Sequence, residues 1–350
     1  ATSYTGIGVF GDLAQVDVYG TVEGNYYGVA GNGTNRTDLT YGGTVINVYD
    51  GANITHTCET DGVGIFQSQL GITNIYGGTI RGLVGVQVSA GTINISGGNI
   101  IAEGEIPSSG NIATPDNNYT YTSSGNIVDG AALSIVNRSG GYAGYINVNI
   151  TGGNFHSENG DAVLEYTANA NCEKVDSISI TGGTFNGANS DINVQLKDSS
   201  VAEPVVEGGT FTNSVAAYVA DGLKYEANSD GVFTYHRTIE SAVAAAGSGG
   251  SVSMISNGAA VDETTGRTIT RIDGGSKTTM TVADGYVYTL PELDKNGYTF
   301  VGWRVNNSNT ILKPGDTYTV NSDVTFTAVW NMINVPDTYE ISVISSDGGT

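Results

Sequence analysis

The residue types that most often carry catalysis or bind metals are few in this sequence, and their spacing does not group them. The three histidines, His56, His156 and His236, have no metal-ligand spacing to one another or to a cysteine. We expect the two cysteines, Cys58 and Cys172, to be unpaired and mostly buried, as small apolar side chains rather than nucleophiles. We therefore predict no catalytic residue and no metal ligand among these five.

Acidic residues dominate the titratable groups, with 35 Asp and Glu against 13 Lys and Arg, for a formal net charge of −22. This charge argues against nucleic acid and anionic membranes as partners, because both are bound through Lys and Arg. Two distant acids such as Glu165 and Asp191 would act as a general acid and base only if the fold brought them together. The sequence leaves that question open.

Asp and Asn are also frequent in short runs, as at 116–118 and 228–230. Neither run has the spacing of an EF-hand calcium loop. Turn chemistry explains both runs, because Asp and Asn side chains bond to nearby backbone in turns. We therefore predict no cofactor, with bound calcium as the alternative.

Tyrosine and asparagine recur at matching places in short apolar runs, as in VDVYG, VINVYD and TNIYGG. If these runs stack, the tyrosines form an aromatic strip flanked by amides, which suits the apolar faces and hydroxyl groups of sugars. The alternative is that stacking of like residues only stabilises a sheet. The candidate ligand-binding residues are Tyr19, Tyr49, Tyr76, Asn47, Asn74 and Asn94, with Tyr119 and Tyr121 from the segment 101–130.

A repeated motif must position these side chains. Its clearest copy is GTINISGGNI at 91–100, and related copies recur along the first 212 residues, at 16–24, 45–54, 73–82, 148–155, 177–187 and 205–211. Most copies are 20 to 30 residues apart, which is one coil of a solenoid. One step of 55 residues is either two coils or one coil with a long loop. Apolar residues alternate with period 2 inside each copy, as in a strand with one buried face.

Glycine pairs close most copies, and 51 of the 350 residues are Gly. Glycine suits a tight corner because it adopts positive φ without steric cost. Corners, strands and period together resemble the right-handed parallel β-helix of the pectin-lyase-like fold, in the repetitive form found in surface proteins of gut bacteria. The resemblance covers roughly 1–235. It specifies a β-solenoid and leaves the function open, since this fold hosts lyases, hydrolases, tailspikes and adhesins.

A second resemblance lies near the end of the chain. The matching stretches are GYTFVGW at 297–303, KPGD at 313–316 and TFTAVW at 325–330. They resemble the Listeria–Bacteroides repeat, also called the internalin B-repeat, a small β-grasp-like module. Both tryptophans lie in it, and we expect them to be core aromatics. The resemblance implies an exported, cell-surface protein.

These patterns predict an all-β chain, a right-handed parallel β-helix solenoid followed by a small β-grasp-like module. The expected boundaries are 1–235 for the β-helix, 236–276 for a cap or connector with a helix begun by Thr238, 277–331 for the module and 332–350 for a linker or the start of a further domain. The segment 101–130 is expected to project as a loop. No apolar run approaches the ~18 residues of a membrane span, so we expect no membrane insertion. The chain has no opening signal and its last residues begin a new apolar run, so we expect a fragment of a larger secreted protein.

The β-helix resemblance also implies two enzyme mechanisms to test. A uronate lyase needs a cationic base and clustered acids that hold calcium, yet the basic residues before 214 are scattered over different coils. They are Arg36, Arg81, Arg138, Lys174 and Lys197. A polygalacturonase-like hydrolase would show Asp-Asp, His-Gly and Arg-x-Lys strings, and none occurs. We therefore expect no enzymatic activity.

Three hypotheses remain. The first is a non-enzymatic, adhesin-like or stalk segment of a bacterial surface protein that binds glycans or host or bacterial surface proteins. The second is a polysaccharide lyase or glycoside hydrolase of pectin-lyase-like fold. The third is a structural subunit of a surface fibre that associates with copies of itself.

Overall fold

The structure, a computed structural model, describes residues 4–11, 13–32, 43–106, 126–137, 145–167, 175–194, 205–256, 259–261 and 266–333. The chain divides into two compact units, Ala1–Val261 and Asp262–Thr350. Tyr119, Tyr121 and Cys172 lie outside the described residues. Among the described helices, none is long and apolar enough to cross a membrane.

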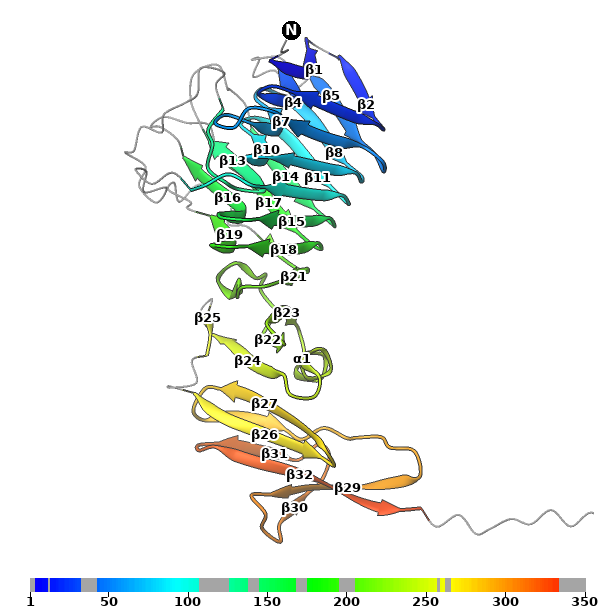
Figure 1. The fold of residues 1–350 in the computed structure, drawn as a ribbon. Coiled ribbons are helices and arrows are strands. Elements are labelled where there is room, and N and C mark those ends of the chain that lie inside the picture. Colours follow the sequence, from blue (N-terminus) through cyan, green and yellow to red (C-terminus); the bar gives the residue numbers. More distant parts are fainter. Residues whose placement is uncertain are drawn as a thin grey trace, which may run out of the picture. The chain divides into compact units, whose positions relative to one another are not determined.

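The first unit is a solenoid built of three parallel sheets (Figure 1). Sheet A contains β1 (Thr5–Phe10), β4 (Tyr27–Asn32), β7 (Val63–Gln67), β10 (Val84–Val88), β13 (Leu133–Asn137), β16 (Asp161–Thr167) and β19 (Ser190–Val194). Sheet B contains β2 (Gln15–Val18), β5 (Thr44–Val48), β8 (Gly71–Ile75), β11 (Gly91–Ile95), β14 (Ile146–Ile150), β17 (Val175–Ile180) and β20 (Val205–Val206). Sheet C begins with β3 (Thr21–Gly24), β6 (Asn53–His56), β9 (Thr79–Gly82), β12 (Asn99–Ala102), β15 (Asn154–Ser157), β18 (Thr184–Gly187) and β21 (Thr210–Phe211).

Each coil therefore contributes one strand to each sheet, and the expected all-β solenoid is confirmed. The segment after each glycine corner is a strand of its own in sheet C, so a coil has three strands. β11 pairs directly with β14 across the 55-residue step, Ile93 lying opposite Val148. That step is one coil with an insertion. Residues 101–102 of the segment expected to be a loop belong to β12 (Asn99–Ala102), and its residues 107–125 lie outside the described residues.

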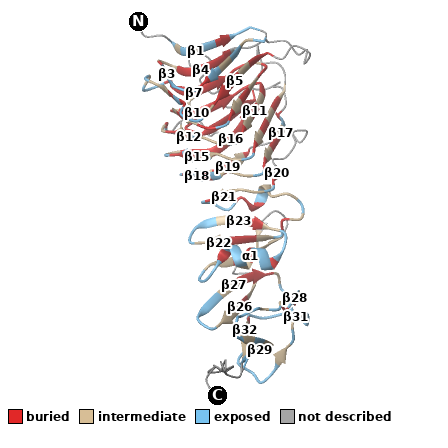
Figure 2. Ribbon diagram, turned by 90° about the vertical axis from the view of Figure 1, so that its right-hand side faces the viewer, coloured by how far each residue is buried: buried red, intermediate tan, exposed pale blue. Residues whose placement is uncertain are grey.

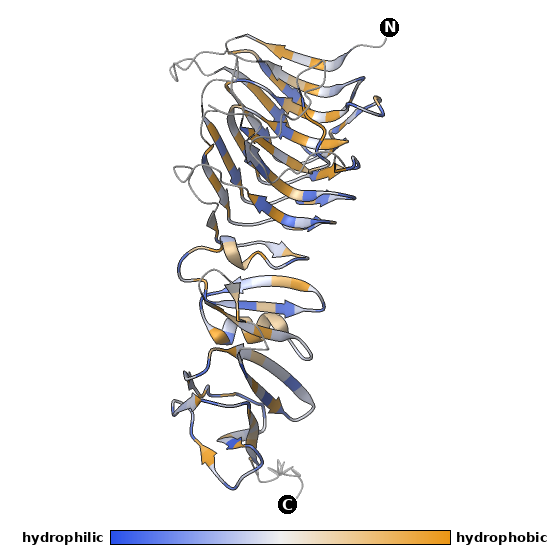
Figure 3. Cartoon of the chain, turned by 90° about the vertical axis from the view of Figure 1, so that its left-hand side faces the viewer, coloured by the Kyte–Doolittle hydropathy of each residue, from blue (hydrophilic) through white to orange (hydrophobic). Residues whose placement is uncertain are grey.

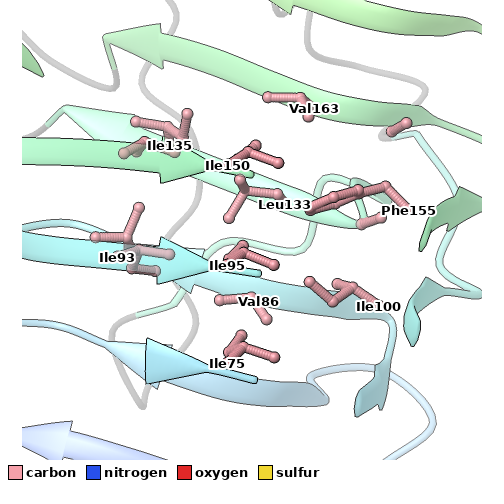
Figure 4. Close-up of a cluster of buried hydrophobic side chains, with 14 of the residues drawn as sticks. Ile75, Val86, Ile93, Ile95, Ile100, Leu133, Ile135, Ile150, Phe155 and Val163 are labelled. Atoms are coloured by element: carbon pink, nitrogen blue, oxygen red, sulfur yellow. The ribbon is translucent and has the colours of Figure 1, made fainter. Parts of the chain in front are cut away.

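The core of the solenoid follows the alternation read from the sequence (Figure 3). Inward-facing side chains stack on like side chains of the next coil, as Ile75, Ile95 and Ile150 do in sheet B (Figure 4). In sheet C the rings of Phe155, Phe185 and Phe211 stack with centroids 4.8 and 5.0 Å apart. Burying these aliphatic and aromatic rows is the main term that holds the coils in register.

The corner between sheets B and C requires glycine at both positions of the pair. Gly98 has a φ of 87°, which residues with a side chain rarely adopt. A Cβ on Gly97 would overlap the carbonyl oxygen of Tyr76 in the previous coil. The paired glycines thus combine a left-handed backbone with close contact between coils.

A hairpin closes the C-terminal end of the solenoid. β23 (Val232–His236) pairs antiparallel with β21, Phe233 opposite Phe211, and also pairs with β22 (Tyr225–Ser229). The core continues into this cap through Leu223 and Tyr235 and through residues flanking the 3₁₀ turn Ala216–Tyr218.

The helix α1 (Ile239–Ala246) packs on β22, β23 and β24 (Ser251–Ser256), and β25 (Ala259–Ala260) pairs with β24. Thr238 accepts a hydrogen bond from the backbone N–H of Ser241, and Gly247 ends the helix at a φ of 67°, as the sequence predicted. The hairpin, rather than the helix, lies against the end of the solenoid, because its strand bonds to the open edge of sheet C and its Tyr235 ring meets Phe211.

The second unit is a small β module. It contains β26 (Arg267–Asp273), β27 (Ser276–Val282), β28 (Tyr286–Thr289), β29 (Tyr298–Val305), β30 (Ile311–Leu312), β31 (Thr317–Val320) and β32 (Val324–Met332). Its main sheet has the order β27-β26-β32-β29-β30, with β26 and β32 parallel, and β28 pairs with β31. Its core includes Ile269, Tyr288, Trp303 and Phe326, while Trp330 is half-buried. The strands begin at 267, earlier than the module boundary of 277 expected from the sequence.

Candidate functional site

The outer face of sheet B places the three predicted tyrosines in one stack. Tyr19, Tyr49 and Tyr76 each follow the last residue of a sheet B strand. Their ring centroids are 4.5 Å apart between Tyr19 and Tyr49, with planes 6° apart, and 5.2 Å apart between Tyr49 and Tyr76, at 25°. Tyr19 is 62% exposed and Tyr76 is 49% exposed. The stack is therefore a surface feature.

The stack ends abruptly after Tyr76. The next positions of the same row carry small hydroxyl residues, Ser96, then Thr151 and Thr181. Parallel stacked rings offer a ligand their edges and hydroxyl groups, because each inner ring face is covered by its neighbour. On the side of Tyr76 that faces the next coil, where Ser96 lies, no ring of a described residue stacks on it.

The middle ring of the stack is chemically distinct. Burial raises the pKa of the Tyr49 hydroxyl, and the neighbouring Tyr19 and Asp17 raise it further. The shift therefore extends the pH range over which this hydroxyl group remains a hydrogen-bond donor.

A second row, next to the tyrosines, is a chain of amide hydrogen bonds that we call the amide ladder. Each Nδ2 donates to the side-chain oxygen one coil earlier: Asn47 to Asp17 at 2.7 Å, Asn74 to Asn47 at 2.8 Å, Asn94 to Asn74 at 2.8 Å and Asn149 to Asn94 at 2.9 Å. Asp17 also accepts from Gln15. Every amide thus points its donor the same way along the solenoid.

The amide ladder changes the role expected for these asparagines. Asn47 is only 7% exposed, and Asn74 and Asn94 are half-buried. Each inner amide uses one N–H and its oxygen on the neighbouring coils, so its first role is to join the coils. Asp17 and Asn149 complete the ladder but were not among the predicted site residues, although they occupy the same place in their copies of the motif.

A third row on this face is partly apolar. Val45, Ile72 and Thr92 lie side by side, all half-buried, on the far side of the amide ladder from the tyrosines. The outer face of sheet B therefore runs from aromatic through amide to aliphatic, which is the mixture that sugar-binding surfaces use.

The acid pair considered from the sequence is separated by the register of sheet A. Glu165 lies opposite Val194, three residues beyond Asp191 on β19. Asp191 is fully buried and accepts hydrogen bonds from the backbone of Gly187 and Asn213. It holds a corner of the last coils together.

The remaining predicted residues serve structural contacts. Asn228 accepts a bond from the backbone N–H of Gly231 in the β22–β23 turn, which is turn chemistry. His56 and His236 both have pKa values lowered by burial, while His156 is exposed. Cys58 is a free thiol, half-buried rather than mostly buried. In the part of the chain that the structure describes, no three His, Cys, Asp or Glu residues gather as metal ligands.

A buried polar network on the outer face of sheet A was not expected from the sequence. Asp129 is fully buried and accepts hydrogen bonds from Ser134 Oγ at 2.5 Å, the Tyr166 hydroxyl at 2.9 Å and the backbone N–H of Ala131 at 3.0 Å. Burial raises the pKa of Asp129 to about 6, against the lowering effect of these bonds. The network holds the segment 126–131 on the sheet.

The signal for this covered face was the missing alternation in the sheet A strands. All five residues of β7 and of β10 are buried, as the red strands of Figure 2 illustrate. Strands with two buried faces read as continuous apolar runs. The lack of alternation in VGIFQ and VGVQV is thus a signal for a covering segment, but it does not say which segment covers the sheet.

The fold defines an all-β protein whose first unit is a parallel β-helix. Residues 268–329 match the family model of the Listeria-Bacteroides repeat domain. This match confirms the repeat module expected from the sequence and indicates a bacterial surface protein. Comparisons with curated proteins and with solved structures found no match.

Proposed function

We propose that the chain is a non-enzymatic, adhesin-like segment of a bacterial surface protein that binds neutral glycans on sheet B, where the tyrosine stack ends. The observation that carries the proposal is the change from Tyr76 to Ser96 in the tyrosine row. Tyr76 is 49% exposed, and among the described residues only the ring of Tyr49 stacks on it. The repeat module supports an extracellular location at the cell surface.

The step between Tyr76 and Ser96 has the chemistry of a sugar site. A pyranose ring has an apolar face that packs on an aromatic ring, and hydroxyl groups that need hydrogen-bond partners. Ser96 and Thr151 supply hydroxyl groups beside the ring. Asn94, in the adjacent row, keeps one N–H beyond the bond that it makes in the amide ladder.

The absence of catalysis is supported by how the buried carboxylates are used. Asp161 accepts from Asn189 and Asn193, and Asp191 accepts from corner backbone groups. A general acid or base needs to face a substrate, whereas both of these groups hold the solenoid together. Incubation with a polysaccharide panel tests this point, and new reducing ends or unsaturated uronates would contradict it.

We further infer that the solenoid is of the right-handed, pectin-lyase-like kind. The three parallel sheets per coil and the asparagine row support this inference. An experimental structure tests it, and coils wound in the opposite hand would contradict it.

The glycan site is tested by extending the stack rather than shortening it. The variant Ser96→Tyr adds a fourth ring to the stack next to Tyr76, so we expect it to abolish binding to neutral oligosaccharides while the protein stays folded. The control is Thr181→Tyr, in the same row but two coils away from Ser96, which should bind as the wild type does. Unchanged affinity in Ser96→Tyr, measured by calorimetry on an array-selected oligosaccharide, would refute the site.

A further inference from the structure

The repeat module contains a cleft with an unusual cation inside it. The cleft has a volume of about 90 Å³ and is lined by Arg271, Asp273, Ser276, Thr278, Leu293 and Trp303. All these residues belong to the second unit. This volume is well below that of a drug-sized site, so the cleft takes one end of a small ligand and leaves the rest in solvent.

Arg271 faces the core side of the sheet. On β26, alternate residues share a face, and Arg271 follows Ile269, which is fully buried. Its partner in the register on β32 is Phe326, also fully buried. Arg271 thus replaces an aliphatic core residue at the end of the sheet where the cleft opens.

The guanidinium of Arg271 is held by an aromatic ring but has no acceptor. Its Cζ lies 5.0 Å from the centroid of the Trp303 ring. Its Nε is buried and makes no hydrogen bond, and no described residue forms an ion pair with it. Arg271 is half-buried, and its buried Nε lacks an acceptor, which is unfavourable, so an anion that reaches this edge of the guanidinium would be stabilised.

The other lining groups limit what anion would fit. Asp273 accepts a hydrogen bond from Trp330 Nε1 at 2.8 Å through Oδ1, which leaves Oδ2 to accept from a ligand hydroxyl. Ser276 and Thr278 provide hydroxyl groups on the neighbouring strand, opposite Asp273 and Arg271. A ligand that satisfies this cleft carries one carboxylate and several hydroxyl groups.

We propose that this cleft binds an acidic monosaccharide unit, with the sugar carboxylate on Arg271 and sugar hydroxyl groups on Asp273, Ser276 and Thr278. The bidentate geometry of a guanidinium suits a carboxylate. The site is independent of the tyrosine stack, which lies in the other unit and would take neutral sugars.

Tryptophan fluorescence of the full chain tests the proposal directly, because the two tryptophans, Trp303 and Trp330, contact Arg271 and Asp273. We expect saturable quenching by D-glucuronate and none by its neutral methyl ester or by glucose. Acetate should quench much more weakly than glucuronate. Absence of a saturable signal with glucuronate would overturn the proposal, and so would an equal response to acetate, which would indicate a simple anion site.

Substitution assigns the signal to the cleft. Arg271→Gln should weaken glucuronate binding by about tenfold or more, as expected for the loss of a charge-assisted bond. The matched control is Arg304→Gln. Arg304 is exposed and lies on the face of β29 opposite to Trp303, so this variant should bind glucuronate as the wild type does. Equal affinity of the two variants would overturn the proposal. If Arg271→Gln failed to fold, the comparison of glucuronate with its methyl ester on the wild type would still test whether the cleft requires a carboxylate.

Discussion

The amide ladder predicts that one asparagine in its middle stabilises the solenoid more than the asparagine at its end. Asn74 donates to Asn47 and accepts from Asn94, both at 2.8 Å, whereas Asn149 has one ladder bond, to Asn94. Asn74→Ala therefore removes two hydrogen bonds and leaves the oxygen of Asn47, 7% exposed, without its donor.

The magnitude follows from these counts. Each net hydrogen bond contributes about 1 kcal/mol, and a buried polar atom left unsatisfied costs about 1 kcal/mol or more. We expect Asn74→Ala to lower the free energy of unfolding by about 2 to 3 kcal/mol and Asn149→Ala by about 1 kcal/mol. The exposed pair Asn154 to Asn99 in sheet C gives a third reference, where Asn154→Ala should cost less than about 1 kcal/mol.

The assay can separate the two units. Both tryptophans lie in the second unit, so their fluorescence follows the module in a denaturant titration, while far-UV circular dichroism follows mainly the solenoid. Asn74→Ala should move the dichroism transition and leave the fluorescence transition unchanged. Equal costs for Asn74→Ala and Asn149→Ala would refute the ladder as a coil-joining device.

Three further predictions concern the core, a corner and a buried acid. Phe185→Ala, which removes a ring stacked on both sides, should cost about 4 kcal/mol or more in the same titration, and a cost below about 2 kcal/mol would contradict the packing. Gly98→Ala should destabilise by about 1 to 3 kcal/mol through its φ of 87°, while Gly20→Ala, with open space around it, should be nearly neutral. The raised pKa of Asp129 makes its contribution to stability complete below its ordinary pKa of 3.8 and lost as pH rises through about 6, by up to about 3 kcal/mol. Asp129→Asn should remove that part of the pH dependence between about pH 4 and about pH 7, and an unchanged profile would contradict it.

The sequence predicted the solenoid well where one face of a strand meets solvent. Sheet B alternates, so its inward rows and its tyrosine and asparagine rows could be placed by residue. Thr73 is the exception, because it faces inward between Ile46 and Ile93 and donates its hydroxyl to Gln67 at 3.1 Å. A polar side chain that faces the core needs a hydrogen-bond partner from another strand. The periodicity of one strand does not predict that partner.

Other features depended on distances that the sequence does not contain. The strands of sheet C carry little strand signal of their own, since four residues such as TIRG give little periodicity. The covering of sheet A by Asp129 and its neighbours joins residues 37 positions apart in the chain. The stacking of Tyr76 on Tyr49 could be predicted from the motif, but the exposed fraction of Tyr76 could not, because it depends on side chains of other coils. Arg271 was not considered, because a single arginine in a strand carries no pattern of its own.

Because all amide donors in the ladder point the same way, the residue at its first position determines how the distant amides are oriented. A carboxylate cannot donate a hydrogen bond, so Asn47 must donate its N–H to Asp17 at the end of the amide ladder. The oxygen of Asn47 then accepts from the next asparagine, and the same donor direction continues to Asn149. An asparagine at position 17 would permit the opposite polarity, with every oxygen and nitrogen exchanged. One acidic residue in the first coil therefore determines which atoms Asn94 displays beside Ser96, three coils away.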